Sequence, residues 1–304
     1  MTKKRLFTFL AFIMIAALSL TACKADPWKN IGAEDNPIIF AAVPSGETER
    51  VVTGFEQVAD LIFDATGLVI EPFVATSYTA AIEALCADPP QAHMGALATF
   101  SYILAAEKGC VETALISTRY GNAYYNGQFL VHVDSGLEKL EDLAGKTYCR
   151  VDVTSASGWI VPSIMLKGLG IDPETDLAEI VDAGSHDAVV AGVYNGDCDF
   201  GTTWVDARDI VVEDYPDVMD KTVVIALEPD IPNDGIQFHV NFPEDIKATL
   251  VAAFLALYDT EEGAAAMEEA YNWGGMQEGD DTFYDTFRQI LDASGVSAAE
   301  IAED

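Results

Sequence analysis

Short apolar runs and amphipathic segments alternate along most of the chain. Residues 36–43 form an apolar, β-branched run that predicts a strand, and polar turn residues follow it. Apolar side chains then recur every three or four residues, which predicts a helix with one buried face, ended by Gly67. The apolar positions of this helix are Val51, Val52, Phe55, Val58, Ala59 and Ile62. The order strand, turn, helix is typical of an α/β unit.

The alternation continues in two sets of elements. In the first set we expect further strands at 68–74, 93–97 and 111–117, and helices at 76–87 and 99–108. In the second set we expect strands at 127–133, 147–151, 177–181 and 199–203, a helical turn at 140–143, and helices at 157–169, 185–194 and 204–212. Strands at 223–227 and 236–240 then precede helices at 243–258, 261–271 and 282–291.

Two α/β sets joined by extended crossings predict a two-lobed clamshell. Each lobe is expected to be a doubly wound sheet with flanking helices, the first comprising residues 37–125 plus 227–304 and the second residues 126–226. In such sheets a ligand binds beyond the carboxyl ends of the strands, where helix N-termini converge. The binding site is therefore expected in the cleft between the lobes, with hinges near 124–127 and 222–226.

The N-terminus has the pattern of an export signal. Three basic residues precede an apolar run at 6–20, which is short for a membrane span and ends in small residues beside Cys23. This pattern resembles bacterial lipoprotein signals. It predicts a signal peptide at 1–22, lipidation of Cys23 and a tether at 23–36, so that the protein is anchored to the cell membrane, at the cell surface or in the periplasm. An uncleaved anchor helix or a soluble secreted protein are the alternatives.

Acidic residues outnumber basic ones by 50 to 16, and the loss of residues 1–22 leaves a net charge of −37. A chain this acidic is not expected to bind nucleic acid. The acidity is typical of a solvated surface, and an adaptation to salty surroundings is the alternative.

Four cysteines remain after Cys23, an even number in an exported chain, and this favours two disulfides. Three pairings are possible. We prefer Cys86 with Cys110 and Cys149 with Cys198, because each pair then stays within one lobe. A metal site is not expected, since Cys-x-x-Cys spacing does not occur and the histidines are dispersed. Those histidines are His93, His132, His186 and His239.

Four stretches of the sequence carry a family resemblance. They are Val43 to Ser45 with the helix around Phe55, Tyr78 to Leu85, Asp142 to Gly170, and Ala183 to Trp204. In this order and spacing they resemble the substrate-binding proteins of phosphate, phosphite and phosphonate ABC importers, which have the type II-like periplasmic-binding-protein fold. The resemblance implies an extracytoplasmic receptor that works as a monomer, needs no cofactor, and delivers a small oxyanion to a membrane permease.

The most informative segment lies between a predicted strand and helix. Thr154, Ser155, Ser157 and Gly158 can direct hydroxyl and backbone N–H groups at one point, aided by the helix dipole, which suits a tetrahedral oxyanion. An ordinary helix N-cap is the alternative reading. The family commonly has a third hydroxyl residue where Ala156 stands. Either the ligand is smaller or less oxygen-rich than phosphate, or another segment supplies the missing donor, for which Thr99 and Ser101 are candidates.

Other candidate ligand contacts lie at neighbouring helix starts. Ser45, Tyr78 and Thr79 are expected to face the ligand from the first lobe. His186 opens a helix within the matched motif and could donate to an oxyanion, although a structural role is the alternative. Asp206 could accept a hydrogen bond from a P–OH group or pair with the ammonium group of an aminophosphonate. A solvated carboxylate at a helix start is the alternative for Asp206.

Sequence motifs distinguish an enzyme from a binding protein. Nucleophile-elbow, zinc-protease, Walker and dinucleotide-binding motifs do not occur, so we do not expect an enzyme. The same fold could bind a thiamine precursor, a sulfonate or nitrate, or could serve a sensor. The abundance of hydroxyl donors in the matched loops favours an oxyanion. We expect neutral donors to hold this ligand as the clamshell closes by hinge motion.

Overall fold

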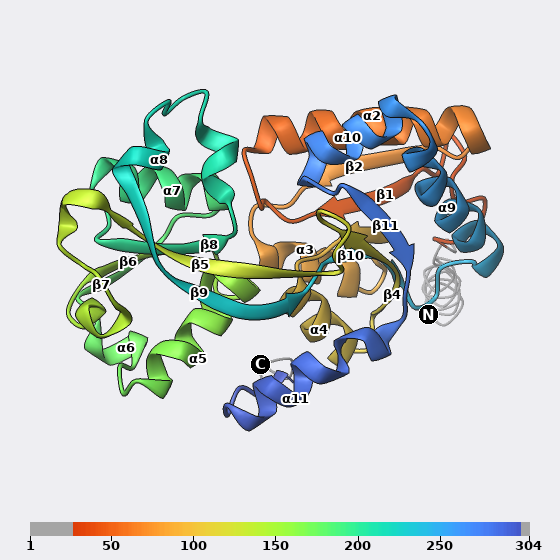
Figure 1. Ribbon diagram of the computed structural model, residues 1–304. Coiled ribbons are helices and arrows are strands. Elements are labelled where there is room, and N and C mark those ends of the chain that lie inside the picture. The colour runs from red at the N-terminus through yellow and green to blue at the C-terminus, as the bar shows by residue number, and fades with distance from the viewer. Residues whose placement is uncertain (1–26, 299–304) are drawn as a thin grey trace, which may run out of the picture.

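A computed structural model describes residues 27–298 of the protein. The predicted signal peptide, the predicted lipidation site Cys23 and the first residues of the tether lie outside the described residues. Two α/β lobes lie side by side, joined by long strands (Figure 1). Among the described helices, none combines the length and hydropathy needed to cross a membrane.

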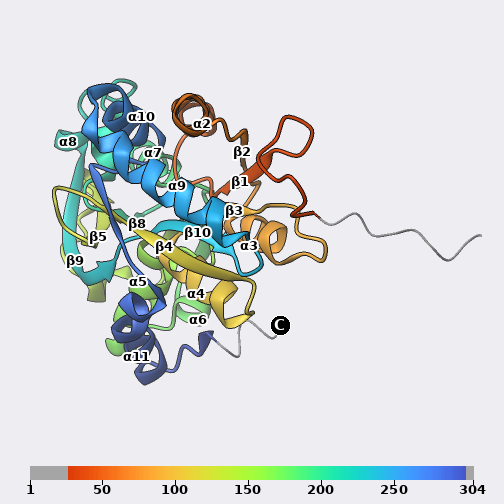
Figure 2. The ribbon, with the colours of Figure 1, turned by 90° about the vertical axis from the view of Figure 1, so that its right-hand side faces the viewer.

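The first lobe is built on a mixed six-stranded sheet in the order β11-β4-β10-β3-β1-β2. Its strands are β1 (Ile38–Ala42), β2 (Ile70–Val74), β3 (Met94–Ala96), β4 (Val111–Thr118), β10 (Gly235–His239) and β11 (Gly275–Glu278). Its helices are α2 (Thr48–Thr66), α3 (Tyr78–Cys86), α4 (Thr99–Glu107), α9 (Glu244–Ala256), α10 (Glu261–Tyr271) and α11 (Asp285–Ala293). Helices α2, α9 and α10 cover one side of this sheet, and α3 and α4 cover the other (Figures 1 and 2).

Helix α2 illustrates how the apolar pattern produces this packing. Its predicted face is buried, and Gly67 ends the helix in a left-handed conformation, as the sequence predicts. The Phe55 ring lies 4.6 Å from the ring of Phe40 on β1 and 5.1 Å from that of Tyr271 at the end of α10. Helix α2 and a helix more than 200 residues later are thus held together by one aromatic cluster.

The second lobe contains a five-stranded sheet in the order β7-β6-β8-β5-β9. Its strands are β5 (Tyr124–His132), β6 (Thr147–Arg150), β7 (Glu179–Asp182), β8 (Phe200–Trp204) and β9 (Thr222–Pro232). Its helices are a π-helical turn (Ala156–Ile160) continuing into α5 (Val161–Gly168), α6 (Pro173–Asp176), α7 (His186–Asn195) and α8 (Val218–Lys221), with 3-10 turns at Leu140–Leu143 and Ala207–Val211. The helix expected at 204–212 is therefore only a short 3-10 turn.

Strands β5 and β9 connect the lobes (Figure 1). They pair antiparallel from Tyr124 opposite Pro232 to His132 opposite Thr222. The expected hinge segments, 124–127 and 222–226, lie within this pair of strands. The division into residues 37–125 plus 227–304 and 126–226 stays a prediction.

The strand pair contains a buried carboxylate. Glu228 is 3% exposed, and within residues 27–298 neither of its carboxylate oxygens has a hydrogen-bond partner. A Cβ atom at Gly127 would lie 2.1 Å from the Glu228 carboxyl carbon, so a larger residue at Gly127 would force the Glu228 side chain to move. Burial raises the pKa of Glu228 well above its ordinary value of 4.5.

We expect the buried Glu228 carboxyl to make stability fall as pH rises above about 4.5, the ordinary value, because the folded protein retains a proton that the unfolded chain releases. A Glu228→Gln variant, which cannot ionise, is expected to lose this pH dependence and to be more stable at pH 8 by about 1–3 kcal/mol. Urea denaturation between pH 5 and pH 8 measures both effects. The exposed Glu179→Gln change in β7 is the control, and parallel pH profiles for Glu228→Gln and the wild type would contradict the prediction.

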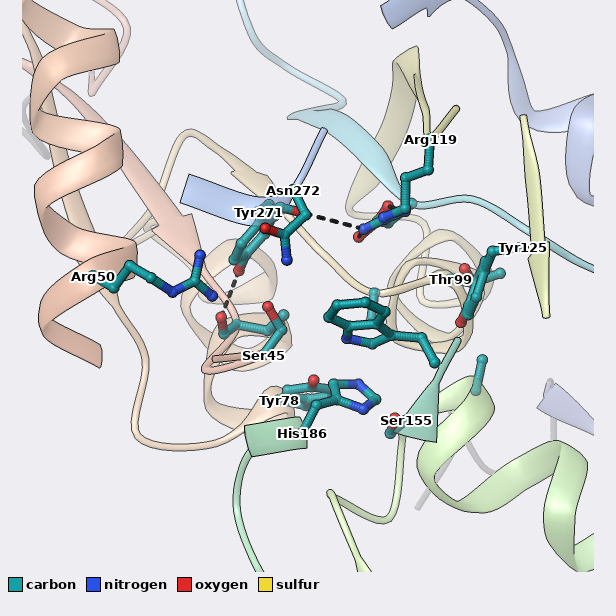
Figure 3. Close-up of a pocket in the computed structure, with 15 residues that line it drawn as sticks. Ser45, Arg50, Tyr78, Thr99, Arg119, Tyr125, Ser155, His186, Tyr271 and Asn272 are labelled. Atoms are coloured by element: carbon teal, nitrogen blue, oxygen red, sulfur yellow. Dashed lines mark hydrogen bonds and ion pairs between the residues drawn. The ribbon is translucent and has the colours of Figure 1, made fainter. Parts of the chain in front are cut away.

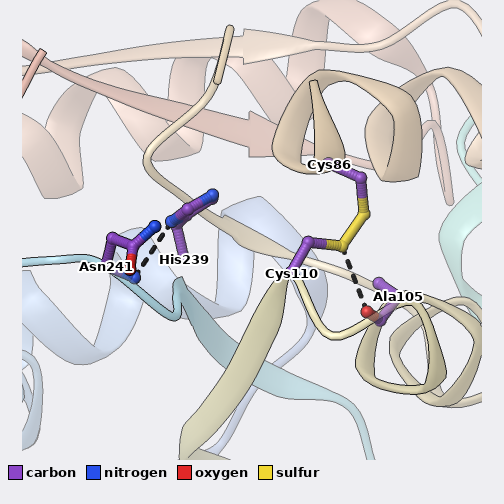
Figure 4. Close-up of a disulfide and its surroundings, with 5 residues drawn as sticks. All are labelled: Cys86, Ala105, Cys110, His239 and Asn241. Atoms are coloured by element: carbon purple, nitrogen blue, oxygen red, sulfur yellow. Dashed lines mark hydrogen bonds between the residues drawn. A yellow bond between two sulfur atoms is a disulfide. The ribbon is translucent and has the colours of Figure 1, made fainter. Parts of the chain in front are cut away.

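Two disulfides join the described cysteines, Cys86 to Cys110 and Cys149 to Cys198. These are the pairs preferred from the sequence, and each lies within one lobe. The first connects the end of α3 to the residue before β4 (Figure 4). The second connects β6 to the turn before β8, two strands that are neighbours in the sheet.

Candidate ligand-binding site between the lobes

An enclosed cavity lies where the two lobes meet (Figure 3). Its volume is about 40 Å³, whereas one water molecule needs about 10–15 Å³ by the same measure. The space therefore suits a ligand of only a few non-hydrogen atoms. The lining residues are Val43, Ser45, Arg50, Tyr78, Ala98, Thr99, Arg119, Tyr125, Ser155, Ala156, His186, Trp204, Asp234, Tyr271 and Asn272.

Four helices begin at this cavity. Tyr78 is the first residue of α3, Thr99 of α4 and His186 of α7, and Ala156 begins the π-helical turn that leads into α5. Each helix follows a strand, so the cavity lies at the carboxyl ends of both sheets. First-turn N–H groups have no acceptor within their own helix, and the helix dipoles place partial positive charge at these ends. The convergence favours an anion.

The lobes contact each other directly around the cavity. The backbone N–H of Tyr78 donates to the Asp152 carboxylate at 3.3 Å, and that of His186 donates to the Ser45 carbonyl oxygen at 3.2 Å. The hydroxyls of Ser101 and Thr154 lie 3.1 Å apart. These three contacts join the lobes, so the clamshell is closed.

The loop after β6 is held in shape by its own side chains. Asp152 accepts hydrogen bonds from the backbone N–H and the hydroxyl of Thr154, at 2.8 and 3.0 Å. Ser155 caps the helical turn by accepting from the N–H of Gly158 at 3.1 Å. The Tyr148 hydroxyl donates to the carbonyl oxygen of Gly158 at 2.9 Å. This network presents Ser155 and Ala156 to the cavity.

The structure brings five of the predicted ligand contacts to the cavity and leaves six outside its lining. Those that line it are Ser45, Tyr78, Thr99, Ser155 and His186. Those outside the lining are Thr79, Ser101, Thr154, Ser157, Gly158 and Asp206.

The predicted residues outside the lining differ in their surroundings. Thr79 is exposed on α3. The hydroxyls of Ser101 and Thr154 bond to each other between the lobes. The Ser157 hydroxyl accepts from the hydroxyl of Tyr125, a lining residue, at 3.5 Å. Thr99 lines the cavity, but its hydroxyl donates to the Pro232 carbonyl oxygen at 2.7 Å.

Asp206 does not line the ligand cavity. Its carboxylate pairs with the guanidinium of Arg208 and accepts from the Gln128 side-chain amide at 3.0 Å. Burial by itself raises the pKa of Asp206, but the hydrogen bonds from Arg208 and Gln128 outweigh it and lower the pKa. The carboxylate is thus ionised and already paired within the second lobe.

His186 is a neutral group at the cavity. Burial, reinforced by the nearby Arg119 cation, lowers the pKa of His186 to about 3. Its Nδ1 atom is buried, and no partner for it occurs within the described part of the chain. A neutral imidazole offers one donor and one acceptor at physiological pH. Burial also raises the pKa of the Tyr78 and Tyr125 hydroxyls, which therefore remain protonated donors.

Two arginines that sequence reasoning missed also line the cavity. Arg119, just beyond β4, forms an ion pair with Asp234 at 2.9 Å, and its Nη1 atom donates to the Asn233 side chain at 2.8 Å. Arg50, in the first turn of α2, donates to the Glu269 carbonyl oxygen at 2.5 Å and extends toward Ser45 (Figure 3). The sequence contained a signal that could have identified Arg119, because this residue directly follows an apolar strand in a chain with only 16 lysines and arginines.

Comparison with known proteins decides the family. A family model described as "ABC transporter, phosphonate, periplasmic substrate-binding protein" matches residues 40–284. This chain belongs to that family. The binding protein is therefore a component of an ABC importer that acts outside the cytoplasm, as the sequence resemblance implies.

Relatives and solved structures agree with this assignment. The binding protein is similar to the phosphate-import protein PhnD of Mycolicibacterium smegmatis, with 27% identity over 92% of this chain and 93% of the relative. A binding-protein component of an ABC phosphonate transporter from Pseudomonas aeruginosa has a TM-score of 0.79 at 19% identity, covering 88% of this chain and 89% of that chain. PhnD1 from Prochlorococcus marinus in complex with methylphosphonate has a TM-score of 0.76 at 15% identity, covering 89% and 100%. The predicted two-lobed α/β fold of the binding protein is confirmed.

Proposed function

We propose that this protein captures a phosphorus oxyanion, namely phosphate, phosphite or a phosphonate, in the cavity between its lobes and passes it unchanged to the permease. The observation that carries the proposal is the convergence of four helix N-termini on a closed cavity of about 40 Å³. A small tetrahedral oxyanion matches this geometry, because its oxygens can accept from several N–H groups at once.

Side chains complete the proposed set of donors. Ser45 and Tyr78 contact the ligand from the first lobe, and Ser155 and His186 contact it from the second. Thr99 supports them through the backbone at the start of α4, since its hydroxyl bonds to Pro232. Arg50 adds a positive charge that the neutral-donor mechanism expected from the sequence did not include. Opening of the clamshell separates the two halves of this set, so that the ligand is released at the permease.

The ligands of related proteins support this class. The Prochlorococcus marinus structure contains methylphosphonate, and the Mycolicibacterium smegmatis relative is named for phosphate import. Both ligands are phosphorus oxyanions of the size that the cavity suits. We propose only this chemical class for the present protein. The protein binds the ligand without a catalytic step.

The same proposal includes the mode of attachment. We propose that residues 1–22 are removed, that Cys23 is lipidated and holds the monomeric receptor at the membrane, and that residues up to 36 form the tether. Metabolic labelling with a radioactive fatty acid is expected to mark the wild type and not a Cys23→Ser variant. Equal labelling of the two proteins would remove the anchor from the proposal.

Calorimetric titration of the purified protein without residues 1–23 tests the proposed ligand class. The ligands are phosphate, phosphite and methylphosphonate, with sulfate and thiamine as controls. Saturable binding of at least one phosphorus compound, and weaker binding of both controls, is the expected result. Binding of sulfate or thiamine alone would retain the family and replace the ligand class, and binding of none would remove the proposed ligand.

A further inference from the structure

Asp234 and Arg119 form an ion pair at the edge of the ligand cavity. Among the described residues that line the cavity, Asp234 is the only carboxylate, and Arg50 and Arg119 are the only cations. The Arg119 and Asp234 side chains are each 17% exposed, so their charges are largely removed from solvent. The Arg119 guanidinium also lies 5.7 Å from the ring centre of Tyr125, another lining residue.

The Asp234 carboxylate is held in place from several elements. Its Oδ1 atom accepts from the Ser117 hydroxyl at 2.8 Å, the Arg119 Nη1 atom at 2.9 Å and the Trp273 indole N–H at 3.1 Å. Two of these donors do not depend on Arg119. Asp234 therefore keeps two hydrogen bonds when Arg119 is replaced, and its negative charge then faces the cavity unpaired.

A carboxylate partner offsets the desolvation of an ammonium group most directly in a cavity this small. Asp206, which the sequence suggested for that role, pairs with Arg208 outside the lining. Asp234 lines the cavity, but the Arg119 guanidinium already occupies its accepting side. An incoming ammonium would meet a fixed cation and no available carboxylate.

We infer that Arg119 is a specificity-determining residue: it occupies the cation position beside Asp234, so that the cavity accepts small phosphorus oxyanions without an amino group and rejects aminoalkylphosphonates. This inference rests on the proposed ligand class and adds the chemistry that the site excludes. The exclusion is electrostatic, because like charges placed together in a desolvated site cost several kcal/mol.

A pair of ligands of equal shape separates charge from size. Propylphosphonate and 2-aminoethylphosphonate have the same number of non-hydrogen atoms and differ in the terminal methyl or ammonium group. Calorimetric titration of the wild type is expected to show that 2-aminoethylphosphonate binds more weakly than propylphosphonate. Its affinity is expected to be about 10- to 100-fold lower than that of methylphosphonate. Equal or tighter binding of 2-aminoethylphosphonate would overturn the inference without any variant.

The Arg119→Ala variant is expected to reverse this preference. It frees the Asp234 carboxylate and opens space. The variant should therefore bind 2-aminoethylphosphonate more tightly than propylphosphonate, by about 10-fold or more. Arg119→Lys, which keeps a cation, is the matched control and should retain the wild-type preference. If Arg119→Ala raises the affinity for propylphosphonate and for 2-aminoethylphosphonate equally, ligand size and not charge sets the specificity, and the inference fails.

Three further outcomes of these experiments also have a defined meaning. If Arg119→Ala does not fold, Arg119→Gln removes the charge while retaining hydrogen-bonding groups, and the same reversal is expected. If the wild type binds phosphate or methylphosphonate but does not discriminate by charge, the specificity inference fails and the proposed function stands. If the wild type binds no phosphorus compound, both fail together.

Discussion

The Ser155→Ala, Ser157→Ala double variant is expected to bind its oxyanion about 1–3 kcal/mol more weakly, about 5-fold or more, because the Ser155 hydroxyl is lost as a hydrogen-bonding group at a charged ligand. Ser155 lines the cavity and caps the turn that presents its backbone N–H groups. Ser157 is buried and accepts from the hydroxyl of Tyr125, a lining residue. Calorimetric titration of both proteins with the preferred phosphorus ligand measures the loss.

Ser163→Ala is the matched control for this variant. Ser163 lies on α5, the continuation of the same helical segment, and its hydroxyl has no partner within residues 27–298. The control is expected to keep the wild-type affinity. Unchanged affinity in the double variant would show that the loop after β6 does not hold the ligand, whereas a loss in Ser163→Ala as well would indicate a general effect on folding.

Removal of the second-lobe disulfide is expected to have the largest effect on stability. The Cys149→Ala, Cys198→Ala variant should lower the free energy of unfolding by about 4 kcal/mol in the chain-entropy model, because the bond closes a loop between residues 49 positions apart. Both cysteines are 3% exposed, so the bond lies in the core of the second lobe. Urea denaturation of the variant and the wild type under the same conditions measures the difference.

The first-lobe disulfide provides the comparison for this prediction. Cys86 and Cys110 are 24 positions apart, and the same model gives about 3.5 kcal/mol for their loop. The two alanine pairs should therefore destabilise in the order of their loop lengths, with Cys149 and Cys198 the larger. No loss of stability on removing Cys149 and Cys198 would contradict the chain-entropy explanation.

The local charge at the cavity runs against the charge of the whole protein. The chain has a net charge of −34, yet Arg50, a balanced Arg119–Asp234 pair and four helix N-termini line the cavity. Long-range repulsion of an anion is screened within about 10 Å at 0.1 M salt, whereas the donors act at contact distance. An acidic surface is thus compatible with capture of an anion, because the enclosed site provides the favourable interactions.

Much of the fold follows from local sequence pattern. The three- and four-residue spacing of apolar positions predicts α2, and helix α10 lies where the periodicity places it, at 261–271. Hydrophobic periodicity is a local property, so it identifies elements without knowledge of their neighbours. For the loop at 152–158 the hydroxyl residues and the family resemblance together predict an anion-facing turn, and anion binding there stays a prediction, with Ser155 in the cavity lining.

Tertiary structure decided which charges meet at the site. Arg119 and Asp234 are 115 positions apart and become partners only because β10 lies beside β4 in the first sheet. Asp206 accepts a hydrogen bond from Gln128 on β5, 78 positions away, and Glu228 is buried against Gly127, through packing that has no local signal. The sequence by itself determined most of the helices and strands, because these depend on neighbouring residues, and their alternation predicted the two-lobed class. Only the tertiary structure decided the charge balance of the cavity, because that balance depends on contacts between residues far apart in the chain.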